Sequence, residues 1–177
     1  MRRIIGNQSS KEKRHPLDLY STDPSWTRVL LREQILINPI WEPASGEGKM
    51  SEVLEEVYDV FSSDVSTGED FLTSKRRSNS IVTNPPYRLL DEFIKHGLEQ
   101  TNQYLCLLIG WHFISGGVKR SSNIWVPHPP NRVIVIPERM KVNGKTSQFN
   151  HAWVVWDVTK PSPATSLEWR SICTVIY

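Results

Sequence analysis

The segment Asn84-Pro85-Pro86-Tyr87 carries the residue types that a site needs to hold a planar amino group. It follows a short apolar run, residues 80–83, which predicts a strand that ends where the segment begins. An Asn side-chain oxygen and a main-chain carbonyl can each accept one N–H of an amine, and prolines add no competing donor. A Tyr ring can stack on a flat substrate. The segment therefore predicts chemistry on an exocyclic amine, with a nucleobase favoured; a loop terminator or a proline-rich ligand is the alternative reading.

A second motif lies upstream, where an apolar run from residue 35 leads to Glu42 and then to a small-residue turn with Gly46 and Gly48. Residues 50–57 follow with apolar side chains at helical spacing, so the pattern predicts strand, glycine turn and helix. Glycines let the backbone approach a ligand closely, and a helix N-terminus favours anionic groups. The spacing is not the complete dinucleotide-binding fingerprint, and a tight strand–helix turn explains it equally well.

Two acids follow the glycine turn at positions where acids bind nucleosides. Residues 57–64 predict a second strand that ends in Asp64, and such an acid in a doubly wound fold binds ribose hydroxyls. Asp70 stands beside Phe71, and this pair can accept from an adenine amine while the ring packs on its face. Ordinary strand-end and turn roles for the acids, and core packing for Phe71, are the alternatives.

In this order the motifs resemble the S-adenosylmethionine-dependent DNA amino-methyltransferases, the adenine-N6 branch in particular. Two more pieces agree with the resemblance. Residues 18–24, Asp-Leu-Tyr-Ser-Thr-Asp-Pro, precede a predicted helix through Trp26 and Leu30 and are similar to that family's N-terminal cofactor motif. Residues 149–157, Phe-Asn-His-Ala-Trp-Val-Val-Trp-Asp, are similar to the closing strand of small phage-type adenine methyltransferases. The resemblance covers residues 16–158 and rests on five ordered motifs.

The resemblance implies S-adenosylmethionine as the cofactor and a role for each matching residue. The residues from Glu42 to Gly48 would frame its methionine part, Asp64 its ribose and Asp70 its adenine amine. The family usually has Thr directly before Pro, and here Asp23 intervenes, which shifts the match of Thr22 by one position. The implied cofactor-binding residues are Tyr20, Thr22, Pro24, Glu42, Pro43, Ala44, Gly46, Gly48, Asp64, Asp70 and Phe71.

The resemblance also implies the catalytic and substrate-binding residues. Asn84, Pro85, Pro86 and Tyr87 would be catalytic, and they would act on the N6 amine of an adenine that is flipped out of a duplex or lies in a single strand. DNA is the implied partner, double- or single-stranded. We further expect four substrate-binding residues, namely Phe113, Lys119, Arg120 and Arg139.

Composition sets the remaining bounds. The chain has 177 residues, 38% of them hydrophobic, a net charge of +2 and a mean hydropathy of −0.39. It is long enough for a core and has no apolar run of membrane-spanning length, so we expect no membrane partner. Cys106 and Cys173 predict no disulfide framework and fit a reducing cytoplasm, and five scattered histidines without paired spacing predict no metal site.

The domain organisation follows from the same pass along the chain. We expect a flexible basic tail over residues 1–15 and one catalytic domain over residues 16–177, with no separate target-recognition domain. Relaxed sequence preference, a very short target site or a missing specificity partner would follow from that arrangement. The oligomeric state stays open. The basic clusters at residues 75–77 and 119–120 either contact phosphates or form solvated loops.

The predicted fold is α/β, a doubly wound and mostly parallel sheet of the class I methyltransferase, Rossmann-like type, with one antiparallel strand near the C-terminus. Apolar runs predict strands over residues 104–109, 132–136 and 152–156, with an edge strand within residues 171–177. Residues 89–98 have helical spacing. The Gly, Ser and Pro content of residues 114–131 predicts a loop, and Asn143-Gly144 predicts a turn.

Other functions remain open at this point. RNA adenine, cytosine-N4 and protein glutamine would use the same chemistry, although Asn84 favours adenine or glutamine because the resembling cytosine enzymes more commonly have Ser there. A non-catalytic nucleic-acid-binding module with a degenerate cofactor site is the alternative from a different class.

Overall fold

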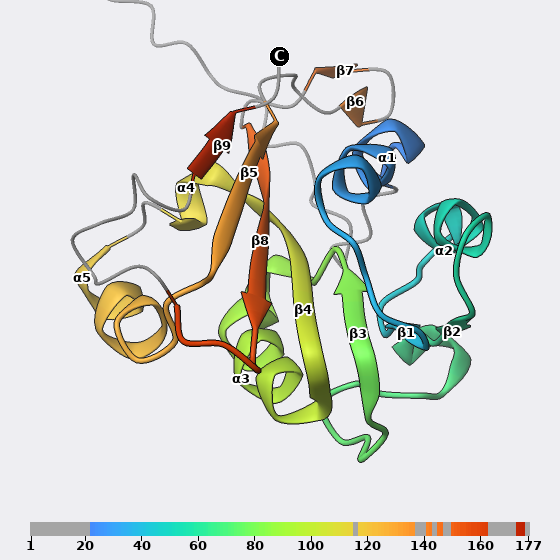
Figure 1. Cartoon of the computed structure of the whole chain (residues 1–177), viewed down its shortest axis with the longest axis horizontal. Helices are drawn as coiled ribbons and strands as arrows, with labels where there is room; N and C mark the ends of the chain where they lie inside the picture. Colours follow the sequence, from blue (N-terminus) through green and yellow to red (C-terminus); the bar gives the residue numbers. More distant parts are fainter. Residues whose placement is uncertain are drawn as a thin grey trace, which may run out of the picture.

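A seven-stranded sheet forms the centre of the molecule in the computed structural model, which describes residues 22–114, 117–136, 141–142, 145–146, 150–162 and 173–175. The strand order is β2-β1-β3-β4-β8-β5-β9 (Figure 1). The strands are β1 Ile40–Glu42, β2 Val60–Ser62, β3 Ser78–Thr83, β4 Thr101–Gly110, β5 Arg132–Ile136, β8 His151–Asp157 and β9 Cys173–Val175.

One strand of the sheet runs against the others. β2, β1, β3 and β4 pair in parallel, β8 pairs antiparallel with both β4 and β5, and β9 pairs parallel with β5. The prediction of a mostly parallel sheet with one antiparallel strand near the C-terminus is confirmed. The described parts of residues 137–149 also contain a small antiparallel pair, β6 Lys141–Val142 and β7 Lys145–Thr146, while the predicted turn at residues 143–144 lies outside the described residues.

The helices connect the strands and cover both faces of the sheet. Three of them are α1 Pro24–Glu33, α2 Lys49–Glu55 and α3 Leu90–Gln100. The shorter ones are α4 Trp111–Ile114, α5 Val118–Arg120, the 3₁₀ turns η1 Val65–Thr67 and η2 Tyr87–Leu89, and the π-helical turn η3 Ser121–Trp125. Within the described ranges, no helix has both the length and the apolar character that crossing a bilayer requires.

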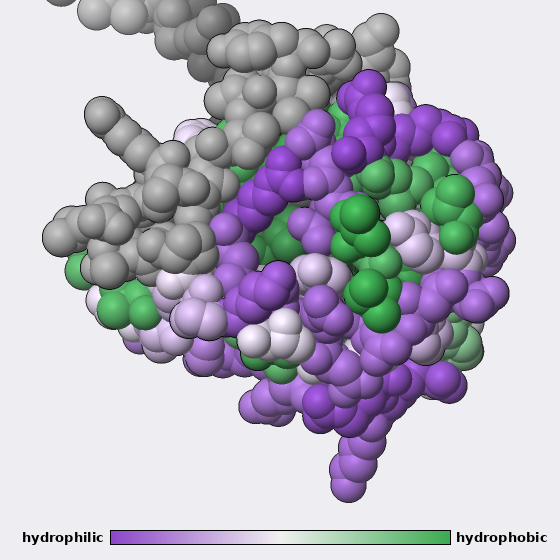
Figure 2. Space-filling model, in the orientation of Figure 1, coloured by the Kyte–Doolittle hydropathy of each residue, from purple (hydrophilic) through white to green (hydrophobic). Residues whose placement is uncertain are grey.

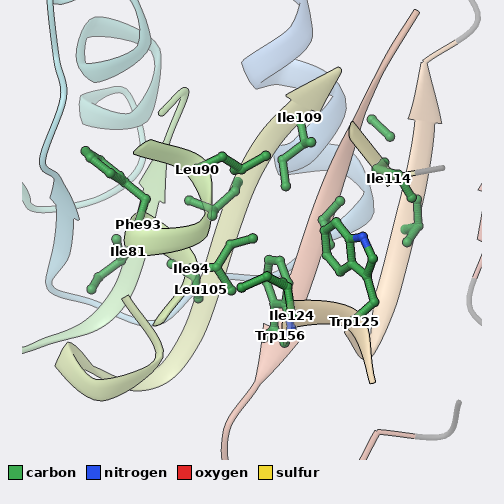
Figure 3. Close-up of a cluster of buried hydrophobic side chains, with 14 of the residues drawn as sticks. Ile81, Leu90, Phe93, Ile94, Leu105, Ile109, Ile114, Ile124, Trp125 and Trp156 are labelled. Atoms are coloured by element: carbon green, nitrogen blue, oxygen red, sulfur yellow. The ribbon is translucent and has the colours of Figure 1, made fainter. Parts of the chain in front are cut away.

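The strands read as continuous apolar runs because both faces of the sheet are buried. Side chains alternate along β4, so Leu105, Leu107 and Ile109 enter one cluster while Cys106 and Leu108 enter the other. Residues of α3 and η3 complete the first cluster, and residues of α1 and α2 complete the second. Figure 3 shows Leu90, Phe93 and Ile94 of α3 directed at the strands, with Ile124 and Trp125 of η3 beside Trp156.

The predicted loop over residues 114–131 is wrong in its central part. Residues 118–125 form α5 and η3, and Ile124 and Trp125 are buried in the first cluster, where the Trp125 ring stacks on Trp156 with centroids 6.2 Å apart. The flanking Gly, Ser and Pro residues hid this short helical segment, whose two apolar side chains gain free energy by covering the sheet. The second strand is also shorter than predicted, since β2 begins at Val60 and Val57 is exposed.

The face of the molecule in Figure 2 is mostly hydrophilic, with apolar atoms in several places, among them the region of α1 and α2. The exposed apolar side chains Ile35 and Ile37 lie in the connection from α1 to β1, and Val57 follows α2. The two connections are adjacent, because the backbone N–H of Leu36 donates to the Tyr58 hydroxyl at 3.2 Å. These apolar side chains lie on the α1–α2 side of the sheet.

Candidate active site

The predicted site residues gather at one edge of the sheet because the strands that carry them are parallel. Glu42 ends β1, Asp64 follows β2 by two residues, Asn84 directly follows β3 and Trp111 directly follows β4. Ligands of doubly wound folds bind at this carboxyl edge. The antiparallel strand β8 starts at the same edge, where His151 pairs with Gly110.

The glycine turn between β1 and α2 is held against the end of β2 by its backbone. Ser45 N–H donates to the Ser63 carbonyl at 3.0 Å, and Gly46 N–H donates to Asp64 Oδ2 at 3.0 Å. Gly48 lies in the left-handed region with φ 80° and forms the N-cap of α2. A Cβ placed on Gly48 would meet no atom within 4 Å, so this glycine serves the turn and leaves open space beside the helix start.

Glu42 is a buried acid with few partners. Its carboxylate accepts from the Ser51 hydroxyl of α2, and Ser51 also contacts the Ser62 hydroxyl. Burial raises the pKa of Glu42 to about 8, although the hydrogen bonds from Ser51 oppose the shift. Desolvation disfavours the charged form of this carboxyl. A cationic ligand beside it would lower the pKa again and favour the carboxylate.

Asp64 has the opposite electrostatic character. Burial disfavours its charge, but hydrogen bonds from the Ser66 hydroxyl and backbone, together with Gly46 N–H, outweigh burial and lower its pKa below the ordinary value. The two acids are close enough for the Asp64 charge to contribute to the raised pKa of Glu42. At neutral pH the edge therefore holds an ionised Asp64 and a mostly neutral Glu42, so the two acids differ in charge.

Asp70 and Phe71 occupy different environments although they are neighbours. Asp70 is exposed, and its Oδ1 accepts from Leu72 N–H at 3.0 Å. Phe71 is buried in the first core cluster, with ring centroids 5.1 Å from Trp41, 4.8 Å from Phe93 and 5.0 Å from His96. This aromatic packing stabilises the core, so Phe71 has a structural role in the fold.

This packing leads to a prediction for Phe71→Leu. The substitution removes the aromatic contacts and leaves part of their volume unfilled, so we expect it to lower the free energy of unfolding by about 1–2 kcal/mol. Chemical denaturation measures that loss. The dissociation constant for S-adenosylmethionine, measured by calorimetry on the folded variant, should change less than threefold; a large rise without loss of stability would instead make Phe71 a ligand-contact residue.

The Asn84 side chain forms a hydrogen bond with a residue that is distant in sequence. Its Nδ2 donates to the Thr22 hydroxyl at 3.2 Å, and these two residues are 62 positions apart in sequence. Among the described residues, no group hydrogen-bonds to the buried Oδ1 of Asn84. A buried carbonyl oxygen without a partner costs free energy, so this atom is an acceptor in need of a donor.

Asp23, which lies between Thr22 and Pro24 where the family pattern has no residue, caps the first helix. It is the N-cap of α1, where its Oδ1 accepts from Ser25 N–H at 2.9 Å and from the Ser25 hydroxyl at 2.7 Å. Pro24 then opens the helix, as proline does well at a first helical position. The cap displaces nothing at the site, because Thr22 still reaches Asn84. Tyr20, the third residue predicted in this motif, lies outside the described residues.

Tyr87 lies between two side chains of the same sheet edge. Its hydroxyl is 2.8 Å from Nε2 of the buried His151, and its ring stacks on Phe113 with centroids 5.0 Å apart and planes 30° apart. Sequence reasoning missed His151 as a site residue. Its place at the first residue of a predicted strand within a recognised motif was the available signal. The predicted site residue Phe113 does lie beside Tyr87, and Trp111, which begins the same helix α4, is 38% exposed.

The predicted basic residues lie in different parts of the structure and have different contacts. Arg120 forms an ion pair with Asp91 at 2.6 Å and lies over the Phe113 ring at 5.1 Å, so it ties α5 to the start of α3, while Lys119 is exposed. Arg77 donates to the Glu99 carbonyl at 2.7 Å near the amino end of β4, so it lies at the opposite edge from Asn84. Arg139 lies outside the described residues.

No group of three or more His, Cys, Asp or Glu side chains in the described part of the chain is arranged as a metal site. The polar groups at the sheet edge are instead two buried acids and an amide oxygen, which accept hydrogen bonds, beside the backbone of a glycine turn. This set fits an organic, partly cationic ligand with hydroxyl and amino groups.

With this strand order and the antiparallel β8, the chain has the fold of solved structures described as class I S-adenosylmethionine-dependent methyltransferases. A similar solved structure is a protein from Listeria monocytogenes provisionally described as a class I S-adenosylmethionine-dependent methyltransferase, with a TM-score of 0.64 and 14% identity over 94% of this chain and 68% of that one. No protein-family model and no curated protein matches the sequence.

Two further similar structures come from restriction–modification systems. The type IIG restriction endonuclease BpuSI has a TM-score of 0.59 and 11% identity over 77% of this chain and 25% of that one. A modification subunit of a provisionally assigned type I restriction enzyme from Vibrio vulnificus has a TM-score of 0.54 and 13% identity over 81% and 45%. The present chain thus spans less than half the length of both, and the likeness establishes the fold.

Proposed function

We propose that this protein transfers a methyl group from S-adenosylmethionine to the exocyclic N6 amine of adenine in DNA. The observation that carries the proposal is the buried Oδ1 of Asn84, an acceptor without a partner among the described residues, at the same sheet edge as Glu42 and Asp64. The similarity in fold to the modification subunit of a type I restriction enzyme supports DNA as the substrate.

The residues of the edge fit the cofactor. Asp64 would accept from its ribose hydroxyls, Glu42 would face its amino group, and the turn with Gly46 and Gly48 would let it approach the backbone. The exposed carboxylate of Asp70 would accept from its adenine amine. The bound cofactor would supply a methyl group on a sulfonium, so the reaction needs only a positioned nucleophile. The N–CH₃ bond would form as the S–CH₃ bond breaks, its electron pair would return to sulfur to leave a neutral thioether, and the methylated amine would then lose one N–H proton to solvent.

The Asn84–Tyr87 segment would prepare that nucleophile. The N6 lone pair is delocalised into the ring, so the amine is weakly nucleophilic. Asn84 Oδ1 and the Pro85 carbonyl would accept its two N–H bonds and stabilise positive charge as it grows on nitrogen, which is selective for the transition state. Tyr87 would stack on the base, and its ring face would favour the developing cation.

The substrate base must leave the helical stack to reach this edge, either by flipping from a duplex or in single-stranded DNA. Phe113 covers one face of the Tyr87 ring, with ring centroids 5.0 Å apart, which leaves no room for a base between the two rings. The Phe113 ring would therefore have to move before a base could stack on that face of Tyr87. The exposed Lys119 would contact phosphate there.

Methyl-labelled S-adenosylmethionine tests the reaction. The purified chain would be incubated with adenine–thymine and with guanine–cytosine duplexes and single strands, followed by digestion to nucleosides. We expect label in N6-methyladenine from the adenine-containing DNA alone. Label in cytosine would correct the target base. Cofactor binding without label in any DNA would move the proposal to RNA or protein substrates, and absence of cofactor binding would overturn it.

A further inference from the structure

The Tyr87 ring, to which the proposed function assigns base stacking, is already stacked on another aromatic ring of the protein. The Phe113 centroid lies 5.0 Å away and the two ring planes differ by 30°, which is the geometry of a stacked aromatic pair. A nucleobase also presents a flat aromatic face, and such faces stack on Tyr and Phe rings. Phe113 and a base therefore compete for the same face of Tyr87.

Two side chains that contact Tyr87 differ in how firmly they are held. His151 is 5% exposed, its Nε2 lies 2.8 Å from the Tyr87 hydroxyl, and its ring packs on Trp26 with centroids 5.2 Å apart. Its backbone also pairs with Gly110 of β4 inside the sheet. Phe113 is only half-buried and belongs to α4, a helix of four residues. Displacing Phe113 therefore costs less than displacing His151.

Arg120 lies beside Phe113 with hydrogen-bond donors that the protein does not use. Its guanidinium carbon is 5.1 Å from the Phe113 ring centroid, and its Nε donates to Asp91 Oδ1 at 2.6 Å. The two terminal NH₂ groups of this guanidinium make no hydrogen bond within the described residues. The side chain is 24% exposed, so Asp91 holds the cation in place while its terminal donors can reach an anion.

We propose that Phe113 and Arg120 mark the subsite of the target nucleotide, whose base replaces Phe113 on Tyr87 and whose phosphate binds the terminal NH₂ groups of Arg120. A guanidinium fork binds phosphate well, and in a nucleotide the phosphate is bonded to the sugar that carries the base. A cation in contact with the ring that occupies the base position is therefore within reach of that phosphate. This inference rests on the proposed function and names the contacts that receive the nucleotide.

Two short single strands separate the base contact from the phosphate contact. One is a strand of deoxyadenosine, and the other has the same phosphates but abasic sugars throughout. For Phe113→Ala we expect the dissociation constant of the deoxyadenosine strand to fall about fivefold, because one aromatic contact no longer has to be broken. The dissociation constant of the abasic strand should stay within about twofold of wild type. Fluorescence anisotropy of end-labelled strands measures both constants.

The opposite result for the base contact is well defined. An unchanged or higher dissociation constant of the deoxyadenosine strand in Phe113→Ala would overturn the proposal, because Phe113 would then not occupy the place of the base. Phe113→Leu keeps an apolar side chain in α4 and removes only the stacking ring. Its expected shift has the same direction, so it decides the question if the Ala variant does not fold.

Arg120→Gln tests the phosphate contact. We expect the dissociation constants of both strands to rise about tenfold, as for loss of a hydrogen bond to a charged group. The slope of log affinity against log salt concentration should become shallower by about 0.7, the value for one phosphate contact on a single strand.

Lys160→Gln is the matched control, because it removes the same charge far from the site. Lys160 is 69% exposed and lies 3.6 Å from Asp157, which ends β8 at the opposite edge of the sheet. Both dissociation constants should stay within about twofold of wild type. Equal effects of the two substitutions, or an Arg120 effect confined to the deoxyadenosine strand, would overturn the phosphate assignment.

The labelled-methyl assay distinguishes this inference from the proposed function. Wild type that methylates no DNA, but shows both binding shifts as expected, would count against adenine methylation and support the nucleotide subsite. Wild type that methylates adenine, with unchanged binding in Phe113→Ala, would count against the subsite alone. Failure of the wild-type chain to bind either strand would overturn both.

Discussion

Replacing Asn84 by Ala should lower the rate of methyl transfer by about 10²–10³-fold, the loss that follows removal of one group that stabilises charge in a transition state. The substitution deletes the buried Oδ1, which has no hydrogen-bond partner within the described structure, and the Nδ2 that donates to the Thr22 hydroxyl at 3.2 Å, so we expect the free energy of unfolding to fall by no more than about 1 kcal/mol. Melting temperature and S-adenosylmethionine affinity should stay close to wild type. Labelled methyl incorporation at saturating substrate, together with cofactor calorimetry, measures both effects.

Asn79 provides the control for this variant, because it is the same residue type and lies near the start of β3, the strand that Asn84 follows, at the opposite edge of the sheet. Its side chain donates to the Asn38 carbonyl and accepts from Asn102 Nδ2 at 2.9 Å, contacts that serve only the structure. Asn79→Ala should lower the free energy of unfolding by about 1 kcal/mol and preserve the rate. Equal rates in the Asn84 and Asn79 variants would contradict a catalytic role for Asn84.

Replacing Glu42 by Gln should stabilise the ligand-free protein, and the gain should increase with pH. Burial raises the pKa of Glu42 to about 8 from the ordinary 4.5. Because the folded-state pKa is the higher one, the stability contributed by this carboxyl is fully present below pH 4.5 and is lost progressively until the pH exceeds about 8. Gln cannot ionise, and its side-chain oxygen can still accept a hydrogen bond from the Ser51 hydroxyl.

The expected gain for Glu42→Gln is less than about 1 kcal/mol at pH 5 and about 3–5 kcal/mol at pH 9, since each pKa unit corresponds to about 1.4 kcal/mol. Urea unfolding at the two pH values measures it. The same variant should bind S-adenosylmethionine at least tenfold more weakly, because a neutral amide cannot compensate a cationic amine as a carboxylate does.

Glu55 is the control for the Glu42 variant. It ends α2, the helix that carries Ser51, it is exposed, and its charge makes only the smallest of the contributions that raise the pKa of Glu42. Glu55→Gln should change the free energy of unfolding by less than about 0.5 kcal/mol at either pH, as is usual for a surface substitution. A pH-independent gain in the Glu42 variant would mean that the Glu42 carboxyl ionises in the folded protein much as it does in the unfolded chain.

Much of the site followed from local pattern alone. Apolar runs that end in Glu42, Asp64 and Asn84 predicted strand ends, and the parallel arrangement brings such ends to one edge regardless of the details of packing. The helix after the glycine turn followed from the apolar spacing of residues 50–57, whereas the left-handed conformation of Gly48 is known from the structure. These features are short-range consequences of residue type, so they could be read along the chain.

Phe71, Ile124 and Trp125 show where local pattern was insufficient. A Phe beside an acid looks the same whether it packs on a ligand or on Trp41, and only the approach of α3 decided that it is a core residue. The sequence of segment 118–125 predicts a loop because Gly, Ser and Pro residues flank it, yet the segment is helical because burying its two apolar side chains against the sheet is favourable.

The contacts that orient the site were decided by tertiary structure only. Thr22 reaches Asn84 across 62 residues, Tyr87 reaches His151 across 64, and Arg120 pairs with Asp91 across 29. A hydrogen bond depends on distances of a few tenths of an ångström and on the direction of the donor, and neither quantity is encoded in residue spacing. Residue types thus determined which chemistry the sheet edge can support, whereas the packing of α1, β8 and α3 determined how each acceptor is aimed.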